Sequence, residues 1–275
     1  MIQKNATIQV EKVNDHIVNW LKSYAKNAKV NGFVVGVSGG IDSAVTSTLC
    51  AQTGLKTLCL ELPIHQATSH ISRKKEHITQ LKKRFNNVES ISVDLSNVFE
   101  QFKKDVPTTE NEAKLNLSLA NTRSRIRMTA LYYFAGIHGL LVAGTGNKVE
   151  DFGVGFYTKY GDGGVDLSPI ADLVKSEVYA LGKFLRVPES ILTAPPTDGL
   201  FGDERTDEEQ LGASYDELEW AMAQDEKGKS PSDFDGRYLE VFTLYKRLNN
   251  ANKHKMKPIP ICEIPKDLRQ TQHFS

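Results

Sequence analysis

Short apolar runs alternate along this chain with stretches that have helical periodicity. The runs lie at residues 33–37, 57–60, 90–93 and 140–143. A short continuous apolar run is typical of a strand that is buried on both faces, and strands that alternate with helices predict a parallel sheet. We therefore expect an α/β fold, a doubly wound parallel sheet flanked by helices.

Longer stretches of helical periodicity run from Val13 to Tyr24, over residues 111–135 and over residues 233–248. The last of these predicts a terminal helix that ends before the basic cluster at 253–257. An acidic link, rich in turn-forming residues, lies at 197–208. Such a link suits either a mobile lid over a site or a solvated connector.

The predicted helix at 111–135 carries three arginines. Arg125 and Tyr132 are seven residues apart and share one face, while Arg123 and Arg127 share a different face. One of these faces can meet an anionic ligand or a partner subunit. A solvated surface charge is the alternative for each arginine.

The first apolar run leads directly into a polar turn with two glycines, which reads Ser-Gly-Gly-Ile-Asp-Ser at 38–43. A turn between a strand and a helix leaves backbone N–H groups free to bind a phosphate. It is neither a Walker loop nor the dinucleotide Gly-x-Gly-x-x-Gly fingerprint. An ordinary Gly-Gly turn with a polar cap is the alternative.

A second polar turn, at 144–147, follows the fourth apolar run. Because ligands bind at the carboxyl ends of parallel strands, both turns are predicted to lie at the same ligand-binding edge. Residues 152–166 are rich in glycine and aromatic side chains, which is typical of a loop near a ligand.

Composition limits the class of protein. Lys plus Arg and Asp plus Glu both number 34, so the formal charge is zero and nothing favours binding to nucleic acid. No apolar run has membrane-spanning length and the N-terminus has no signal-peptide core, so we expect a cytoplasmic protein with no membrane contact. Cys50, Cys59 and Cys262 are far apart and are predicted to be buried free thiols.

The turn at 38–43 resembles the pyrophosphate loop of the ATP pyrophosphatases, a group of adenine nucleotide alpha-hydrolase fold. Other segments resemble ammonia-dependent NAD synthetases in particular. These are GTGNKVE at 144–150, TKYGDGGVD at 158–166, DLVK at 172–175, NTRSRIRM at 121–128, PTDGL at 196–200, TDEEQLG at 206–212 with Tyr215, and His254-Lys255 before Pro258. The matches extend from residue 33 to residue 260.

The resemblance implies a set of site residues. Contacts to ATP would come from Gly36, Val37, Ser38, Gly39, Gly40, Ile41, Asp42, Ser43, Thr145, Lys175 and Thr197. Asp42 and Glu150 would hold Mg²⁺. Contacts to nicotinic acid adenine dinucleotide, or deamido-NAD, would come from Arg125, Lys159, Asp166, His254 and Lys255, with Asp162 and Tyr132 nearby.

The implied reaction is amidation of deamido-NAD by ammonia through an acyl-adenylate, which gives NAD, AMP and pyrophosphate. Asp162 is a candidate to hold ammonium near the adenylate and take its proton. The resemblance also implies a homodimer with the dinucleotide at the subunit interface, formed in part by the helix that carries Arg125.

Only one predicted helix precedes the strand at 33–37, so the chain has no room for a glutaminase domain. We expect a single synthetase domain over residues 1–275, with free ammonia as the donor unless a separate subunit supplies it.

One segment departs from the pattern. Glu61 precedes Leu-Pro, where many bacterial members have an arginine, in the loop that the resemblance places against the adenosine of ATP. Two alternatives remain open, another ATP pyrophosphatase such as a tRNA-modifying or GMP-forming enzyme, and a non-catalytic ATP-binding module.

Overall fold

The computed structural model describes residues 8–65, 68–197 and 206–269. Its sheet contains β1 (Gly32–Gly36), β2 (Lys56–Glu61), β3 (Val88–Ser92) and β4 (Leu141–Val142). The strands are all parallel, in the order β3-β2-β1-β4. The predicted parallel sheet is therefore confirmed, and each apolar run marks a strand.

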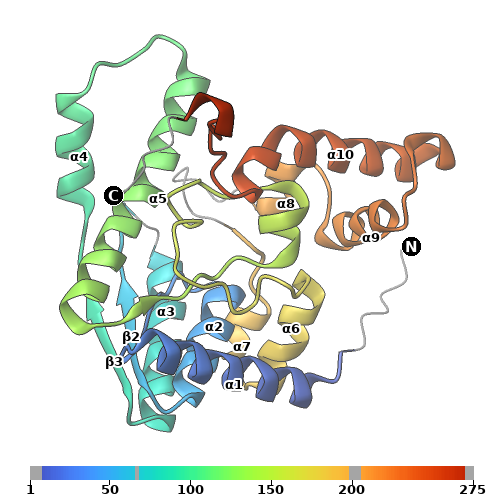
Figure 1. Cartoon of the computed structure of the whole chain (residues 1–275). Coiled ribbons are helices and arrows are strands. Elements are labelled where there is room, and N and C mark those ends of the chain that lie inside the picture. Colours follow the sequence, from blue (N-terminus) through green and yellow to red (C-terminus); the bar gives the residue numbers. More distant parts are fainter. Residues whose placement is uncertain (1–7, 66–67, 198–205, 270–275) are drawn as a thin grey trace, which may run out of the picture.

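Helices cover both faces of this sheet (Figure 1). One face is covered by α1 (Val10–Ala28), α2 (Ile41–Gln52), α3 (Thr68–Arg84) and α6 (Lys175–Phe184), and the other by α4 (Ser96–Asp105) and α5 (Glu112–His138). Successive strand residues face opposite sides. Val35 accordingly packs in the core under α1 and α2, whereas Val34 packs in the core under α4 and α5.

A second hydrophobic core lies beyond the sheet. It is formed by the short α8 (Asp207–Leu211), α9 (Tyr215–Glu226), α10 (Gly236–Met256) and the π-helical turn η1 (Val149–Val154). Helix α9 also contacts α6, so this core joins the sheet next to the carboxyl ends of its strands (Figure 1). Single turns of π-helix are frequent at functional sites.

The remaining elements are short. They are α7 (Glu189–Leu192) and the 3₁₀ turns η2 (Pro231–Asp233) and η3 (Lys266–Leu268). Among the described residues, no helix is both long enough and apolar enough to span a bilayer.

The predicted end of the terminal helix is wrong. Helix α10 continues through Met256, so the basic residues predicted to follow it lie in its last turn. Asn249, which follows the predicted end at residue 248, and Asn252 donate side-chain hydrogen bonds to the carbonyls of Gly153 and Val154. These bonds fasten α10 to the end of η1.

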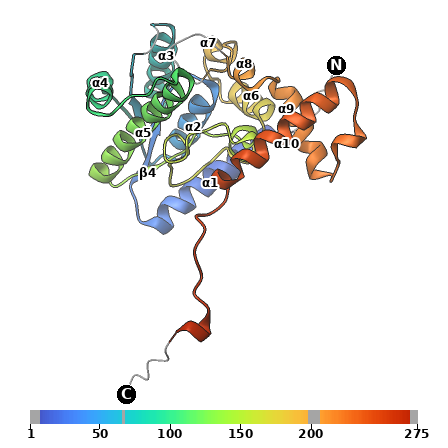
Figure 2. The same ribbon diagram turned by 90° about the horizontal axis from the view of Figure 1, so that it is seen from above.

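Beyond α10 the chain runs away from the body of the molecule (Figure 2). Cys262 lies on this segment and is exposed, which corrects the prediction of three buried thiols. Cys50 and Cys59 are buried and free as expected.

Candidate functional site

Hydrogen bonds between its own serines fix the conformation of the loop between β1 and α2. The hydroxyls of Ser38 and Ser43 lie 3.0 Å apart, and Ser43 Oγ accepts a hydrogen bond from the Ser38 N–H at 3.1 Å. Gly39 has a φ of 87°, in the left-handed region that favours glycine. Helix α2 begins after Gly40 with no side-chain cap, so its first N–H groups remain available to an anion.

Two cavities flank this loop. The larger has a volume of about 230 Å³ and extends from the apolar wall of Leu60 and Leu62 to Glu150. The smaller, of about 60 Å³, lies on the side of α6 and is lined by Gly39, Gly40 and Lys175. The residues that line both cavities are Ser38, Asp42, Thr197 and Asp207.

Lys175 joins the two carboxylates that were predicted to hold a metal. Its Nζ lies 2.7 Å from Oδ2 of Asp42 and 3.0 Å from Oε1 of Glu150, and its side chain is only 4% exposed. Burial alone would lower the pKa of Lys175, but the charges of Asp42 and Glu150 outweigh it and raise that pKa. The lysine is therefore held in its charged form between the two carboxyl groups.

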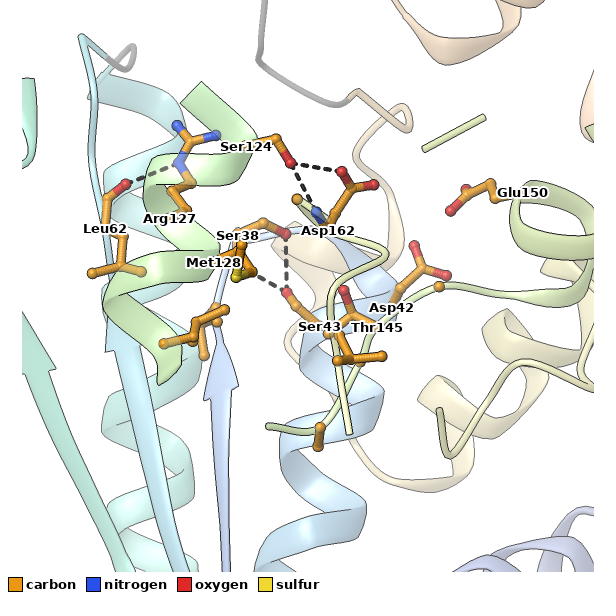
Figure 3. A pocket seen from close by; sticks show the side chains of 18 of the residues that line it. Ser38, Asp42, Ser43, Leu62, Ser124, Arg127, Met128, Thr145, Glu150 and Asp162 are labelled. Atoms are coloured by element: carbon orange, nitrogen blue, oxygen red, sulfur yellow. Dashed lines mark hydrogen bonds between the residues drawn. The ribbon is translucent and has the colours of Figure 1, made fainter. Parts of the chain in front are cut away.

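Asp42 and Glu150 are 108 residues apart in sequence and both point into the larger cavity (Figure 3). Carboxylate oxygens are the ligand type that a small divalent ion such as Mg²⁺ prefers. Within the described ranges, no group of three His, Cys, Asp or Glu side chains is placed to hold a metal. Two carboxylates suit an ion whose other ligands come from phosphate and water.

Asp162 lies across the cavity from Asp42 (Figure 3). Its Oδ1 accepts hydrogen bonds from Ser124 Oγ at 2.6 Å and from the Thr158 N–H at 3.0 Å. Although it can be reached through the cavity mouth, desolvation by the surrounding protein raises its pKa, and these hydrogen bonds only partly oppose that rise. A Cβ on Gly161 would come within 2.3 Å of Ser124 Oγ, so glycine permits this close approach.

The other end of the larger cavity is basic and apolar. Lys74 and Arg127 line it beside Leu60, Leu62 and Met128. Lys74 is 2% exposed, and burial, together with the nearby Arg127, lowers its pKa to about 8. This end therefore suits a flat, partly apolar group that offers hydrogen-bond acceptors.

The predicted ATP and metal residues gather at this site. Those that line one or both cavities are Gly36, Val37, Ser38, Gly39, Gly40, Ile41, Asp42, Ser43, Thr145, Glu150, Lys175 and Thr197, together with Asp162. Part of the predicted lid, residues 198–205, lies outside the described residues. Thr206, just beyond it, caps α8.

The predicted deamido-NAD residues lie elsewhere. Among the described residues that line the two cavities, Arg125, Lys159, Asp166, His254, Lys255 and Tyr132 are absent. Most of them form hydrogen bonds with the backbone instead. Lys255 Nζ donates to the carbonyls of Gly155 and Tyr157, and Lys159 Nζ donates to the carbonyl of His254 at 3.2 Å.

Asp166 and Tyr132 form a pair. The Tyr132 hydroxyl donates to Oδ1 of Asp166 at 3.0 Å, and Oδ2 of Asp166 accepts from the Val142 N–H at 2.8 Å. The pair ties α5 to the end of β4. Arg125 is exposed nearby and donates to the carbonyl of Lys159 at 3.3 Å.

Several residues of the site carry no clear signal in the sequence. Ser124 and Lys74 are single polar residues on helices, where a surface position is the ordinary expectation. Asp151 lines the larger cavity, where burial and the charges of Glu150 and Asp162 raise its pKa to about 8. Its position after a predicted metal ligand was the one available hint.

The sheet and the loop at its carboxyl edge define an α/β nucleotide-binding protein. A family model described as NAD synthase matches residues 13–259. The chain therefore belongs to the NAD synthase family.

Individual relatives support the same family. The NH3-dependent NAD synthetases of Methanosarcina acetivorans and Syntrophomonas wolfei are 34% and 36% identical to this chain, over 92% and 94% of its length and 98% of theirs. The solved structure of an NMN synthetase from Francisella tularensis has a TM-score of 0.78 at 31% identity, covering 94% of this chain and all of that one. The NH3-dependent NAD synthetase of Campylobacter jejuni has a TM-score of 0.74 at 27% identity, covering 93% of this chain and all of that one.

Proposed function

We propose that this protein is an ammonia-dependent NAD synthetase, a ligase that amidates the nicotinate carboxyl group of deamido-NAD with ATP as co-substrate. One observation carries the proposal. The pyrophosphate loop, two carboxylates and a buried lysine meet at a cavity in a chain whose family and relatives carry this activity in their names. The chain acts as a single synthetase domain.

The chemistry explains why such a site is needed. A carboxylate is a poor electrophile, so its oxygen first attacks the α-phosphorus of ATP, and the bond from that phosphorus to the bridging oxygen of pyrophosphate breaks. Ammonia then attacks the carbonyl carbon of the acyl-adenylate. AMP leaves with the carbon–oxygen bond electrons, and the nitrogen loses a proton. The products are NAD, AMP and pyrophosphate.

The loop and Lys175 are placed for the first step. The free N–H groups at the start of α2 and the Lys175 ammonium face the smaller cavity, where they would bind the β- and γ-phosphates. Asp42 and Glu150 would hold Mg²⁺, which would neutralise the phosphate charge. The apolar end at Leu60 and Leu62 would take the adenosine.

Asp162 is placed for the second step. Its carboxylate lies in the larger cavity with Asp42 and Glu150, and Ser124 fixes its orientation. An anion there attracts ammonium and accepts the proton that must leave before nitrogen attacks.

Deamido-NAD would be bound between two copies of the chain. Arg125, Lys159 and His254 are linked to one another, because Arg125 donates to the carbonyl of Lys159 and Lys159 Nζ donates to the carbonyl of His254. Arg125 and His254 are exposed. Helix α5 presents two exposed apolar residues one turn apart on the same face, with Tyr133 64% and Ile137 58% exposed. Such a helix face supports a homodimer that completes the dinucleotide site.

The proposed setting is the cytoplasm. Two free cysteines, Cys50 and Cys59, suit a compartment that keeps thiols reduced. The reaction needs ATP, and neither nucleic acid nor a membrane takes part in it.

A second substrate is supported by the similarity to an NMN synthetase. The same two steps would convert nicotinate mononucleotide into NMN, because both substrates present the same carboxyl group. The dinucleotide is the first choice because the family model and the relatives at 34% and 36% identity are named for NAD.

Phosphorus NMR of a complete reaction tests the proposal. The purified protein is given ATP, Mg²⁺, ammonium and deamido-NAD, and each is omitted in turn. Glutamine replaces ammonium in one further sample, and nicotinate mononucleotide replaces deamido-NAD in another. AMP, pyrophosphate and NAD that appear together only in the complete mixture support the synthetase. Intact ATP favours a non-catalytic nucleotide-binding module, and turnover of nicotinate mononucleotide alone favours the second substrate.

A further inference from the structure

Glu150 accepts two hydrogen bonds on the same oxygen. The Tyr215 hydroxyl lies 2.5 Å from Oε1 of Glu150, and Lys175 Nζ lies 3.0 Å from that atom. We propose that Tyr215 is a positioning residue, which aims the other oxygen of Glu150 at the metal and holds Lys175 beside it. The proposal rests on the proposed function, in which Glu150 binds Mg²⁺ and Lys175 binds phosphate.

The contacts distinguish the two oxygens of Glu150. In the part of the chain that the structure describes, both hydrogen bonds end on Oε1, and Oε2 accepts none. The two oxygens of Asp42 also differ in their contacts, because Oδ2 accepts from Lys175 and Oδ1 accepts from the Asn147 amide at 3.1 Å. Without the Tyr215 hydroxyl, Glu150 would turn about its last bond and share both oxygens with Lys175.

Tyr215 contacts Lys175 through its ring as well. Lys175 Nζ lies 4.7 Å from the ring centroid, within the range of a cation–π interaction. The lysine is therefore bounded by Asp42, Glu150 and an aromatic face. One side chain thus fixes both the predicted metal ligand and the predicted phosphate ligand.

The position of Tyr215 is itself well determined. It is the first residue of α9, whose N-cap Ser214 accepts a hydrogen bond from the Glu217 N–H at 3.2 Å. The N–H of Tyr215 donates to Glu208 of α8 at 2.9 Å, and the side chain is 5% exposed. Helix caps and burial leave the hydroxyl little freedom, as a positioning residue requires.

The hydroxyl has one proton and two acceptors nearby. Oδ2 of Asp207 lies 3.3 Å from it, farther than Oε1 of Glu150, so the proton is directed to Glu150. Burial, together with the charges of Glu150 and Asp207, raises the pKa of Tyr215 well above its usual range.

Binding of Mn²⁺ in place of Mg²⁺ tests the proposal directly. The affinity is measured by electron paramagnetic resonance of free Mn²⁺ in the presence of a non-hydrolysable ATP analogue. Removing a residue that orients a metal ligand typically lowers metal affinity roughly 10- to 100-fold, which is the loss expected for Tyr215→Phe. In turnover, the same variant should need more Mg²⁺ and recover its kcat when Mg²⁺ is in excess.

Tyr245→Phe is the matched control. Tyr245 is also a buried tyrosine of the second core, at 3% exposure, and lines neither cavity. This variant should bind Mn²⁺ as the unmodified protein does. Thermal unfolding of both variants shows whether either change acts only on stability.

Unchanged Mn²⁺ affinity in folded Tyr215→Phe overturns the proposal. If that variant does not fold, Tyr215→Leu, which removes the ring as well, is measured instead, and unmodified affinity there has the same meaning. Failure of the synthetase assignment looks different, because the unmodified protein then produces neither AMP nor NAD in the phosphorus NMR assay.

Discussion

Ser124 and Asp162 form a reciprocal pair of hydrogen bonds. Ser124 Oγ donates to Oδ1 of Asp162 at 2.6 Å and accepts from the N–H of the same aspartate at 2.8 Å. A single hydroxyl on α5 thus fixes both the backbone and the carboxylate of a loop residue 38 positions away. Among the described residues, the second oxygen of Asp162 accepts no hydrogen bond, and Asp162 lines the larger cavity.

We expect Ser124→Ala to impair the use of ammonium. Asp162 would lose two hydrogen bonds and with them its fixed orientation, and kcat/KM for ammonium should fall on the order of 10-fold, the effect of a lost hydrogen bond to a charged group. Steady-state kinetics with ammonium as the varied substrate measures this. Ser118→Ala, a change at an exposed position of the same helix, is the control, and equal losses in both variants would refute the role of Ser124.

Replacement of Lys175 should nearly abolish the reaction. Lys175→Met removes the cation between Asp42 and Glu150 and a predicted phosphate ligand, and a loss on the order of 10²- to 10³-fold in kcat is expected for such an electrostatic element. Release of pyrophosphate is the readout. Lys148→Met is the control, because Lys148 pairs with Asp172 and Glu226 on the surface, and its activity should be unchanged.

Lys74 should contribute to ATP binding, whereas its neighbour should not. Lys74 lines the apolar end of the larger cavity, and Lys75 is exposed. We expect Lys74→Met to raise KM for ATP on the order of 10-fold, with kcat little changed, because a charged donor is lost. Lys75→Met should behave as the unmodified enzyme.

The pH dependence of ATP binding provides a second measurement of Lys74. Burial lowers its pKa to about 8, so its charge is present below pH 8 and is lost as the pH rises through that value. ATP affinity should weaken across this range in the unmodified protein. If the ATP affinity of Lys74→Met weakens equally with rising pH, another group is responsible for the pH dependence.

His77 should make the fold sensitive to acid. It is 1% exposed, it contacts Ser47 Oγ at 2.9 Å, and burial lowers its pKa to about 4. A folded-state pKa below the unfolded value of 6.5 means that its stability is fully present above pH 6.5 and is lost as the pH falls towards 4. The loss should reach about 3 kcal/mol by pH 4.

Denaturant unfolding between pH 4 and pH 7 measures that slope. His77→Leu removes the titrating group, so its stability should depend less on pH in this range, although it is less stable at pH 7 because Ser47 loses a partner. Parallel slopes in the two proteins would assign the acid sensitivity elsewhere.

A charge on the apolar face of α5 should dissociate the proposed dimer. Ile137 is 58% exposed, and Ile137→Asp would bury an unpaired carboxylate in the interface, with a cost of about 3 kcal/mol or roughly 100-fold in the dissociation constant. Light scattering coupled to gel filtration measures the mass. Phe184→Asp on α6 is the control, and a monomeric unmodified protein would contradict the dimer itself.

Short-range patterns predicted much of the fold. The four strands could be located because each coincides with a short apolar run, although β3 is only partly buried, and the predicted sheet is confirmed. The end of α10 could not be located, because the pair Asn249-Asn250 suggests a helix end unless the partners of Asn249 and Asn252 on η1 are known. Such partners are almost 100 residues away in sequence.

The candidate site was predicted in part for a similar reason. Comparison confirms the predicted family, and motif residues such as Asp42 and Glu150 meet at one cavity. The contact of Lys175 with both carboxylates depends on how α6 packs against the loop, which no local pattern contains. Roles for Arg125, Lys159, Asp166, His254 and Lys255 in binding deamido-NAD stay predictions.

The contacts of Lys255 have a consequence for the order in which the protein matures. Lys255 and Asn252 hold the carbonyls of residues that lie about 100 positions earlier, in the segment that carries the chain from Glu150 towards Asp162. This clasp cannot form before α10 has docked, whereas the sheet and the loop after β1 need no contact with it. We therefore expect the sheet to fold first and the segment towards Asp162 to become fixed last, with the docking of α10.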